Sequence, residues 1–170
     1  MLFLIACMLL VALPACGDDY LVSDDPAKTF TEDNGFSITL TEAFSKYEKE
    51  GCTHCYDSKQ VAVFCIQNKL SDYPEMAKIA FEDYVADVVK KNADKKFTRQ
   101  FEIEGITCVE YEVDDLSQEG KTWYFLTAIM QSEDAYWLVQ FMCDHSYADA
   151  LSPAFTAWLT SISFDAAANA

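Results

Sequence analysis

The segment TWYFLTAIMQSEDAYWLVQFMC, residues 122–143, decides the fold. Two apolar runs, 122–130 and 135–143, flank the polar sequence QSED. In the first run, Trp123 and Phe125 point to one side of an extended chain and Tyr124 to the other, because side chains alternate along a strand. Both sides are apolar, which is typical of a strand buried on both faces. The segment therefore predicts a hairpin inside an antiparallel sheet that is covered on both faces.

Other segments supply the rest of that sheet and its two covering layers. Residues 74–92 and 152–162 carry apolar stripes at helical spacing, and Ser152 and Pro153 suit the cap and first turn of the second helix. Helices that cover an antiparallel sheet on its two faces make an α+β fold, here a three-layer α/β/α sandwich with a central antiparallel sheet. The remaining expected strands are 36–40, a hairpin of 46–58 with 61–67, and 96–103 and 106–113.

The N-terminus predicts export. Residues 2–15 form an uncharged apolar run that is too short to span a bilayer as a helix but fits a secretory signal. The run ends in LPAC, residues 13–16, which resembles a bacterial lipobox. That resemblance implies cleavage before Cys16 and acylation of its thiol. A buried N-terminal helix and a signal peptide cut elsewhere are the alternatives.

Four segments follow from this interpretation. We expect a lipoprotein signal peptide over 1–15, an acidic tether over 16–35, one folded domain over 36–164 and a disordered tail over 165–170. The protein would then be extracytoplasmic and attached to the cell membrane through Cys16.

Composition agrees with one globular domain and excludes one class of partner. Of the 170 residues, 51% are hydrophobic, so the chain can bury a core. The formal net charge of −16 repels nucleic acid and anionic lipid headgroups. We expect no nucleic-acid partner; a protein or a small molecule remains possible.

The order of elements resembles the PsbP-like superfamily, which includes the extrinsic photosystem subunit and many bacterial lipoproteins. The likeness rests on GFSITLTEAF (35–44), YWLVQFMC (136–143) and FTAWLTSISF (155–164), with Thr41 where the family usually has proline. These are packing signals spread over most of 35–164. The resemblance implies a binding or assembly module without a shared catalytic residue.

Cysteines raise a separate question. Outside the cytoplasm thiols tend to pair, and Cys52 and Cys55 form a C-x-x-C motif in EGCTHCYD, residues 50–57. If Ser58–Lys59 is the hairpin loop, Cys52 lies opposite Cys65, which makes these two a disulfide candidate. A local Cys52–Cys55 bridge is the other candidate, although a flat strand would point the two to opposite faces.

Two further interpretations of the motif stay open. Cys52 and Cys55 could bind a metal ion together with Cys143 and His145, if these distant segments meet. They could instead form a redox pair, although the acidic neighbours oppose thiolate formation. A metal-binding or thiol-redox lipoprotein is therefore the alternative function.

Motifs for catalysis are missing from the sequence. It contains no G-x-S-x-G, H-E-x-x-H or phosphate-binding G-x-x-x-x-G-K pattern. Its two histidines, His54 and His145, each stand beside a cysteine rather than forming a recognisable triad. We therefore expect neither enzymatic activity nor a cofactor.

Overall fold

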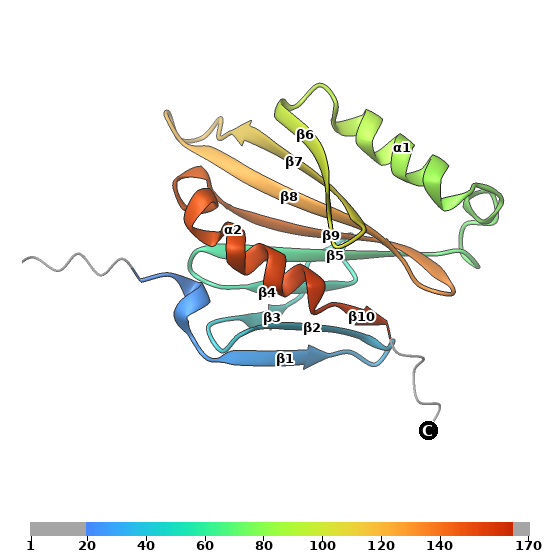
Figure 1. Ribbon diagram of the computed structural model, residues 1–170, viewed down its shortest axis with the longest axis horizontal. Helices are drawn as coiled ribbons and strands as arrows, with labels where there is room; N and C mark the ends of the chain where they lie inside the picture. The colour runs from blue at the N-terminus through green and yellow to red at the C-terminus, as the bar shows by residue number, and fades with distance from the viewer. Residues whose placement is uncertain (1–19, 165–170) are drawn as a thin grey trace, which may run out of the picture.

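The computed structural model describes residues 20–164 and arranges them as one α+β sandwich (Figure 1). A large sheet of seven strands has the order β3-β4-β5-β9-β8-β7-β6, and a small sheet has the order β1-β2-β10. All neighbouring strands are antiparallel. The strands are β1 (Ala27–Thr31), β2 (Phe36–Thr41), β3 (Ser45–Tyr47), β4 (His54–Asp57), β5 (Val61–Lys69), β6 (Lys96–Ile103), β7 (Ile106–Asp114), β8 (Thr122–Gln131), β9 (Ala135–Asp144) and β10 (Ser163–Phe164).

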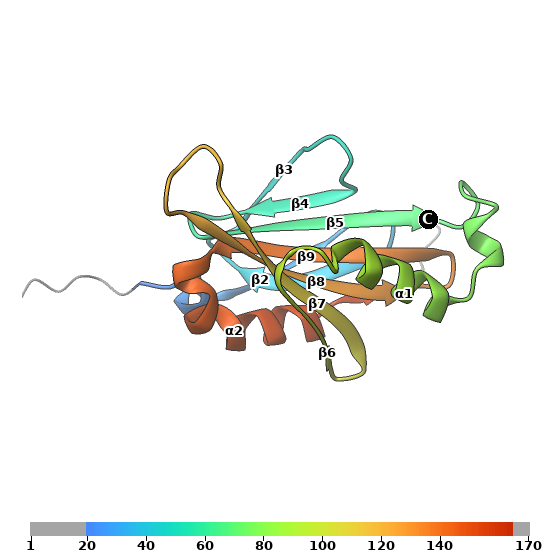
Figure 2. The same ribbon diagram turned by 90° about the horizontal axis from the view of Figure 1, so that it is seen from above.

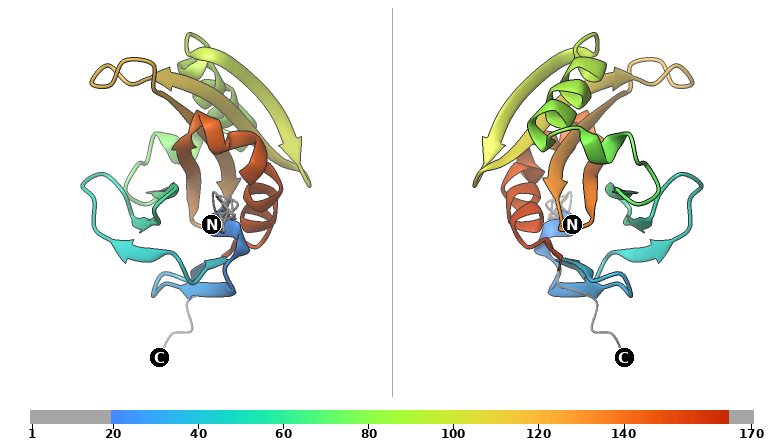
Figure 3. Two further views of the ribbon diagram at one scale, coloured as in Figure 1. Left: turned by 90° about the vertical axis from the view of Figure 1, so that its left-hand side faces the viewer. Right: turned by 90° about the vertical axis from the view of Figure 1, so that its right-hand side faces the viewer.

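Two α-helices lie on opposite faces of the large sheet. Helix α1 (Phe81–Asn92) covers one face, which we call the outer face, where Tyr84 and Val88 pack on β7, β8 and β9. Helix α2 (His145–Thr160) and the small sheet together cover the inner face (Figure 1 and Figure 3). The layer on the inner face, where the sequence predicted a helix alone, thus consists of a helix and a second sheet. Within residues 20–164 no helix is long and apolar enough to cross a bilayer.

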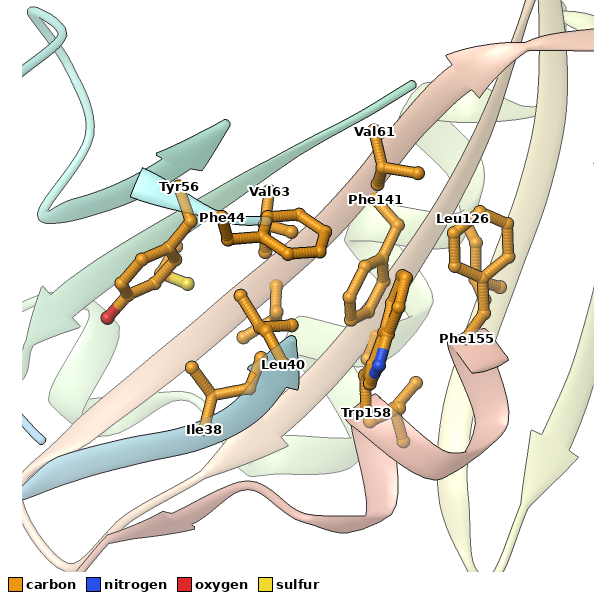
Figure 4. Packing of buried hydrophobic residues seen from close by; sticks show 14 of the residues in the cluster. Ile38, Leu40, Phe44, Tyr56, Val61, Val63, Leu126, Phe141, Phe155 and Trp158 are labelled. Atoms are coloured by element: carbon orange, nitrogen blue, oxygen red, sulfur yellow. The ribbon is translucent and has the colours of Figure 1, made fainter. Parts of the chain in front are cut away.

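The main core lies between the inner face, α2 and the small sheet (Figure 4). Phe141 of β9 contacts Phe155 and Trp158 of α2, with ring centroids 5.5 and 6.2 Å apart. Ile38 and Leu40 of β2 approach the same core from the small sheet. The central position expected for the 122–143 hairpin is confirmed, because β8 and β9 pair with each other between β7 and β5.

The N-terminal part of the domain corrects the expected tether. Residues 20–35 are folded: the 3₁₀ helix η1 (Val22–Asp24) buries Val22, and β1 pairs with β2 along its whole length. In β1 only Phe30 is buried. The signal peptide, Cys16 and the 165–170 tail lie outside the described residues.

Both helices differ from their expected bounds. Helix α1 begins at Phe81, after the separate 3₁₀ helix η2 (Met76–Lys78). Helix α2 begins at His145 because Asp144 caps it, its Oδ1 accepting a hydrogen bond from the Ser146 N–H at 2.9 Å. Pro153 therefore lies inside the helix rather than in its first turn, and Ser152 is not the cap.

Candidate functional site

The C-x-x-C motif lies at the edge of the large sheet, where β3 and β4 extend beyond α1 (Figure 2). The expected hairpin register is wrong by two residues. Cys65 of β5 lies opposite His54, and the turn hydrogen bond from the Ser58 N–H to the Val61 carbonyl makes Lys59–Gln60 the loop. This register removes the geometric argument for a Cys52–Cys65 disulfide.

The three cysteines of this region divide between the two faces. Cys65 points to the inner face and is fully buried in the main core. Cys55 points to the outer face, where it is buried with Ala62 and Phe64. Cys52 packs against that outer cluster, because it precedes β4 outside the strand and is not bound by the alternation of a flat strand. All five cysteines among the described residues are free thiols.

The proposed metal ligands do not come together. Cys143 is buried in the main core on the inner face. His145 lies at the start of α2, with its Nδ1 3.1 Å from a carboxylate oxygen of Glu112. Between residues 20 and 164, no group of three or more His, Cys, Asp or Glu side chains is placed to hold a metal ion.

A polar cluster occupies the inner side of β4, opposite the thiols. Its centre is Glu32, which directly follows β1 and whose side chain is 14% exposed. The Tyr56 hydroxyl donates to Glu32 Oε1 at 2.6 Å, and Lys46 Nζ lies 2.8 Å from the same oxygen. Tyr56 itself is fully buried. The carboxylate therefore joins the small sheet to β3 and β4.

His54 completes this cluster in a defined tautomer. Asn34 Oδ1 accepts from the Phe36 N–H, while Asn34 Nδ2 donates to Gln67 Oε1 at 3.1 Å, so the amide orientation is fixed. His54 Nε2 must then carry the proton that it donates to Asn34 Oδ1 at 3.1 Å. The imidazole also stacks on Phe36, with centroids 5.4 Å apart.

Burial controls the charge of this cluster. Burial lowers the pKa of His54, an effect that Glu32 opposes and Lys46 assists. His54 is therefore neutral at neutral pH, and its 3.7 Å Nδ1 contact with Glu32 is not an ion pair there. Burial raises the pKa of Glu32, but hydrogen bonds from Lys46 and Tyr56 outweigh it and leave that pKa lowered. Burial, followed by the Glu32 hydrogen bond, raises the pKa of Tyr56.

Two adjoining hollows open beside β4. The first, of about 480 Å³, is lined by Tyr47, Cys52, Cys55 and the 48–50 segment. The second, of about 370 Å³, is lined by Glu32, Lys46 and His54, together with residues of the first. The motif, the polar cluster and these hollows form the candidate site.

Part of this site escaped sequence reasoning. Glu32 and Asn34 belong to TEDNG, residues 31–35, which has the turn-forming composition of a tether. Only the pairing of β1 with β2 brings them to His54. The buried Phe30 was the available signal, as a large apolar residue in the polar sequence 23–35.

Comparisons with known proteins identify the fold. No protein-family model matches the sequence, and no curated protein sequence matches it. The solution structure of cyanobacterial PsbP (CyanoP) from Synechocystis sp. PCC 6803 superposes with a TM-score of 0.51 at 12% identity, covering 89% of this chain and 98% of that chain.

Two crystal structures are also similar. One, from Bacteroides thetaiotaomicron VPI-5482, has a TM-score of 0.50 at 12% identity and covers 81% of this chain but 48% of its own. The other, of LpqN, involved in cell envelope biogenesis of Mycobacterium tuberculosis, has a TM-score of 0.48 at 11% identity and covers 84% of this chain and 93% of its own. The superposition on cyanobacterial PsbP, together with the antiparallel sheet and its two helices, confirms the expected architecture: the chain has a PsbP-like α+β fold.

Proposed function

We propose that this protein is a lipid-anchored extracytoplasmic module that binds or assembles with a partner and has no enzymatic activity. The anchor would be acyl chains on Cys16, and the partner a protein or small molecule that meets the hollows beside β4. The PsbP-like fold is compatible with this role.

The observation that carries the proposal is where the domain begins. Tyr20, four residues after Cys16, is already fixed: its carbonyl accepts from Gln60 Nε2 at 2.8 Å, and the Val22 N–H donates to Gln60 Oε1 at 2.7 Å. Four residues span at most about 14 Å. Acyl chains on Cys16 would therefore hold the β4–β5 turn close to the membrane surface.

The polar cluster is oriented away from that end. Strand β1 runs from Ala27 to Thr31, about 17 Å at the usual rise of a strand, before the turn that supplies Glu32 and Asn34. In Figure 1 the 3₁₀ helix η1 and the β1–β2 turn lie at opposite ends of the small sheet. A module held at Cys16 would thus leave the candidate site accessible to a partner.

Side-chain placement supports a non-enzymatic role. His54 projects from the inner side of β4, whereas Cys52 and Cys55 lie on its outer side. The imidazole consequently cannot serve as the base that activates either thiol. The Glu32 carboxylate is also already engaged, because Lys46 and Tyr56 both contact its Oε1.

The anchor can be tested with two cysteine variants expressed in a bacterial host that processes lipoproteins. Wild type and Cys7→Ser, which changes the other cysteine of the N-terminal segment, should partition with membranes and yield an acylated N-terminal Cys16 peptide by mass spectrometry. Cys16→Ser should lose both. Membrane retention of Cys16→Ser with an unmodified N-terminus would overturn the proposal.

Partner binding can be tested with photoreactive residues. A crosslinker placed at Thr53, which lines the first hollow, should give a discrete adduct in native membranes. The matched control is Thr156, an exposed position on α2. Equal adducts from both positions, or none from Thr53, would argue against binding at this site.

A further inference from the structure

The two thiols of the C-x-x-C motif lie together on the outer face of β4. Cys52 packs against the cluster of Cys55, Ala62 and Phe64. A backbone turn just before Cys52 explains this packing. Gly51 adopts a φ of +81°, which favours glycine, and the Cys52 N–H donates to the Lys49 carbonyl at 3.1 Å. This turn carries Cys52 back over Cys55.

The turn is fixed to the neighbouring strand. The Thr53 N–H donates to the Cys65 carbonyl at 2.8 Å, and the Thr53 hydroxyl accepts from the Gln67 N–H at 2.9 Å. Lys49 lies over the Phe64 ring, 4.0 Å from its centroid. These contacts with β5 therefore fix the position of the turn that carries Cys52.

The two thiols differ in their exposure to solvent. Cys52 is partly exposed and borders the 480 Å³ hollow, whereas Cys55 is only 3% exposed. A reagent from solution thus meets Cys52 first. Burial raises the pKa of Cys55 to about 12, with the neighbouring Cys52 adding to the shift and Lys49 opposing it. The Cys55 thiol is therefore protonated at neutral pH.

The other thiols of the described residues lie on the opposite face of the sheet from this pair. Cys65, Cys108 and Cys143 are fully buried in the main core on the inner face of the sheet. The sheet itself separates them from the outer-face pair. An incoming reagent at Cys52 therefore has Cys55 as the neighbouring thiol.

We propose that Cys52 and Cys55 form a thiol–disulfide exchange site, with Cys52 as the entry thiol and Cys55 as the resolving thiol, for substrates that carry an accessible disulfide. The proposal does not depend on the lipid at Cys16. In the first step the Cys52 thiolate attacks one sulfur of the substrate disulfide, forming a mixed disulfide and releasing one substrate thiolate, which takes up a proton. In the second, Cys55 loses its proton to solvent and attacks the Cys52 sulfur, releasing the second substrate thiol. The protein dithiol is oxidised by two electrons and the substrate disulfide is reduced to two thiols, in one stoichiometric reaction per protein molecule that does not make the module a catalyst.

Oxidised glutathione provides a direct test. Trypsin cleavage after Lys49 and Lys59 places Cys52 and Cys55 alone in peptide 50–59, and the next peptide, 60–69, contains only Cys65 as an internal control. Wild type should lose two hydrogens within peptide 50–59. Cys55→Ser should instead retain one glutathione on Cys52, and Cys52→Ser should gain none on Cys55.

Circular dichroism of each variant checks that it is folded. If Cys55→Ser is not folded, Cys55→Ala replaces it and should also retain one glutathione on Cys52. A stable glutathione adduct on wild-type Cys52, or a disulfide joining peptides 50–59 and 60–69, would overturn the assignment. So would equal glutathione uptake by Cys52→Ser and Cys55→Ser.

Discussion

Replacing Tyr56 with phenylalanine removes one hydroxyl from the centre of the polar cluster and preserves the ring that packs on Phe30 at 4.9 Å. The lost interaction is a 2.6 Å hydrogen bond to an ionised Glu32, and bonds to charged groups contribute about 1.5–3 kcal/mol. Glu32 keeps Lys46 and some water access, since its side chain is 14% exposed. We therefore expect a value at the lower end of this range, a loss of about 1.5–2 kcal/mol in the free energy of unfolding. Such a loss corresponds to a decrease of about 5 °C in Tm.

Urea denaturation at neutral pH measures this loss, and a double-mutant cycle assigns it. In a Glu32→Gln background, Tyr56→Phe should cost less than about 1 kcal/mol, because the charge is gone. Tyr73→Phe, at a side chain that is 50% exposed, is the control and should change stability by less than about 0.5 kcal/mol. An equal loss in both backgrounds would refute the assignment to Glu32.

Three further predictions concern the cluster and the second helix. Because the folded pKa of His54 lies below the ordinary 6.5, the unfolded chain takes up its proton first, so stability should fall as pH drops below about 6.5 and level off once the folded pKa is passed; urea titrations should show this component in wild type and not in His54→Gln. Asp144→Ala removes the cap that accepts from Ser146 and should cost about 1 kcal/mol in thermal unfolding, whereas Asp149→Ala, inside the same helix, should cost less. Phe155→Ala opens a cavity beneath α2 and should cost about 3–5 kcal/mol in guanidinium denaturation; a loss below about 1 kcal/mol would contradict the packing described.

The centre of the fold was predictable because its signal is redundant. Strands β8 and β9 are apolar on both faces, so their position inside a covered sheet follows from composition alone. In the edge strand β1, by contrast, a single buried residue distinguishes a strand from a tether. In β1 only Phe30 is buried, and the acids around it have the composition of a tether. Helix α2 also carried a second start signal, Asp144 ahead of Ser146, which the more conspicuous Ser152–Pro153 pair obscured.

The candidate site depended on register and on distant pairing. Shifting the β4–β5 loop from Ser58–Lys59 to Lys59–Gln60 displaces every cross-strand partner by two positions and separates Cys52 from Cys65. The sequence around that turn does not distinguish the two loops. Glu32 reaches His54 through contacts between the two sheets, which local patterns do not encode.

The closing of the small sheet has a consequence for the order in which the chain folds. Strand β10 pairs with β2, and the Ser37 and Ser163 hydroxyls hydrogen-bond across 126 positions of sequence. A chain synthesised from its N-terminus exposes this side of β2 until residues 163–164 have been made, and contacts of such separation form slowly because a long loop must close first. During that interval the open edge of β2 offers unpaired backbone groups to other chains. We expect truncation before Ser163 to make this exposure permanent and to increase aggregation of the newly synthesised chain.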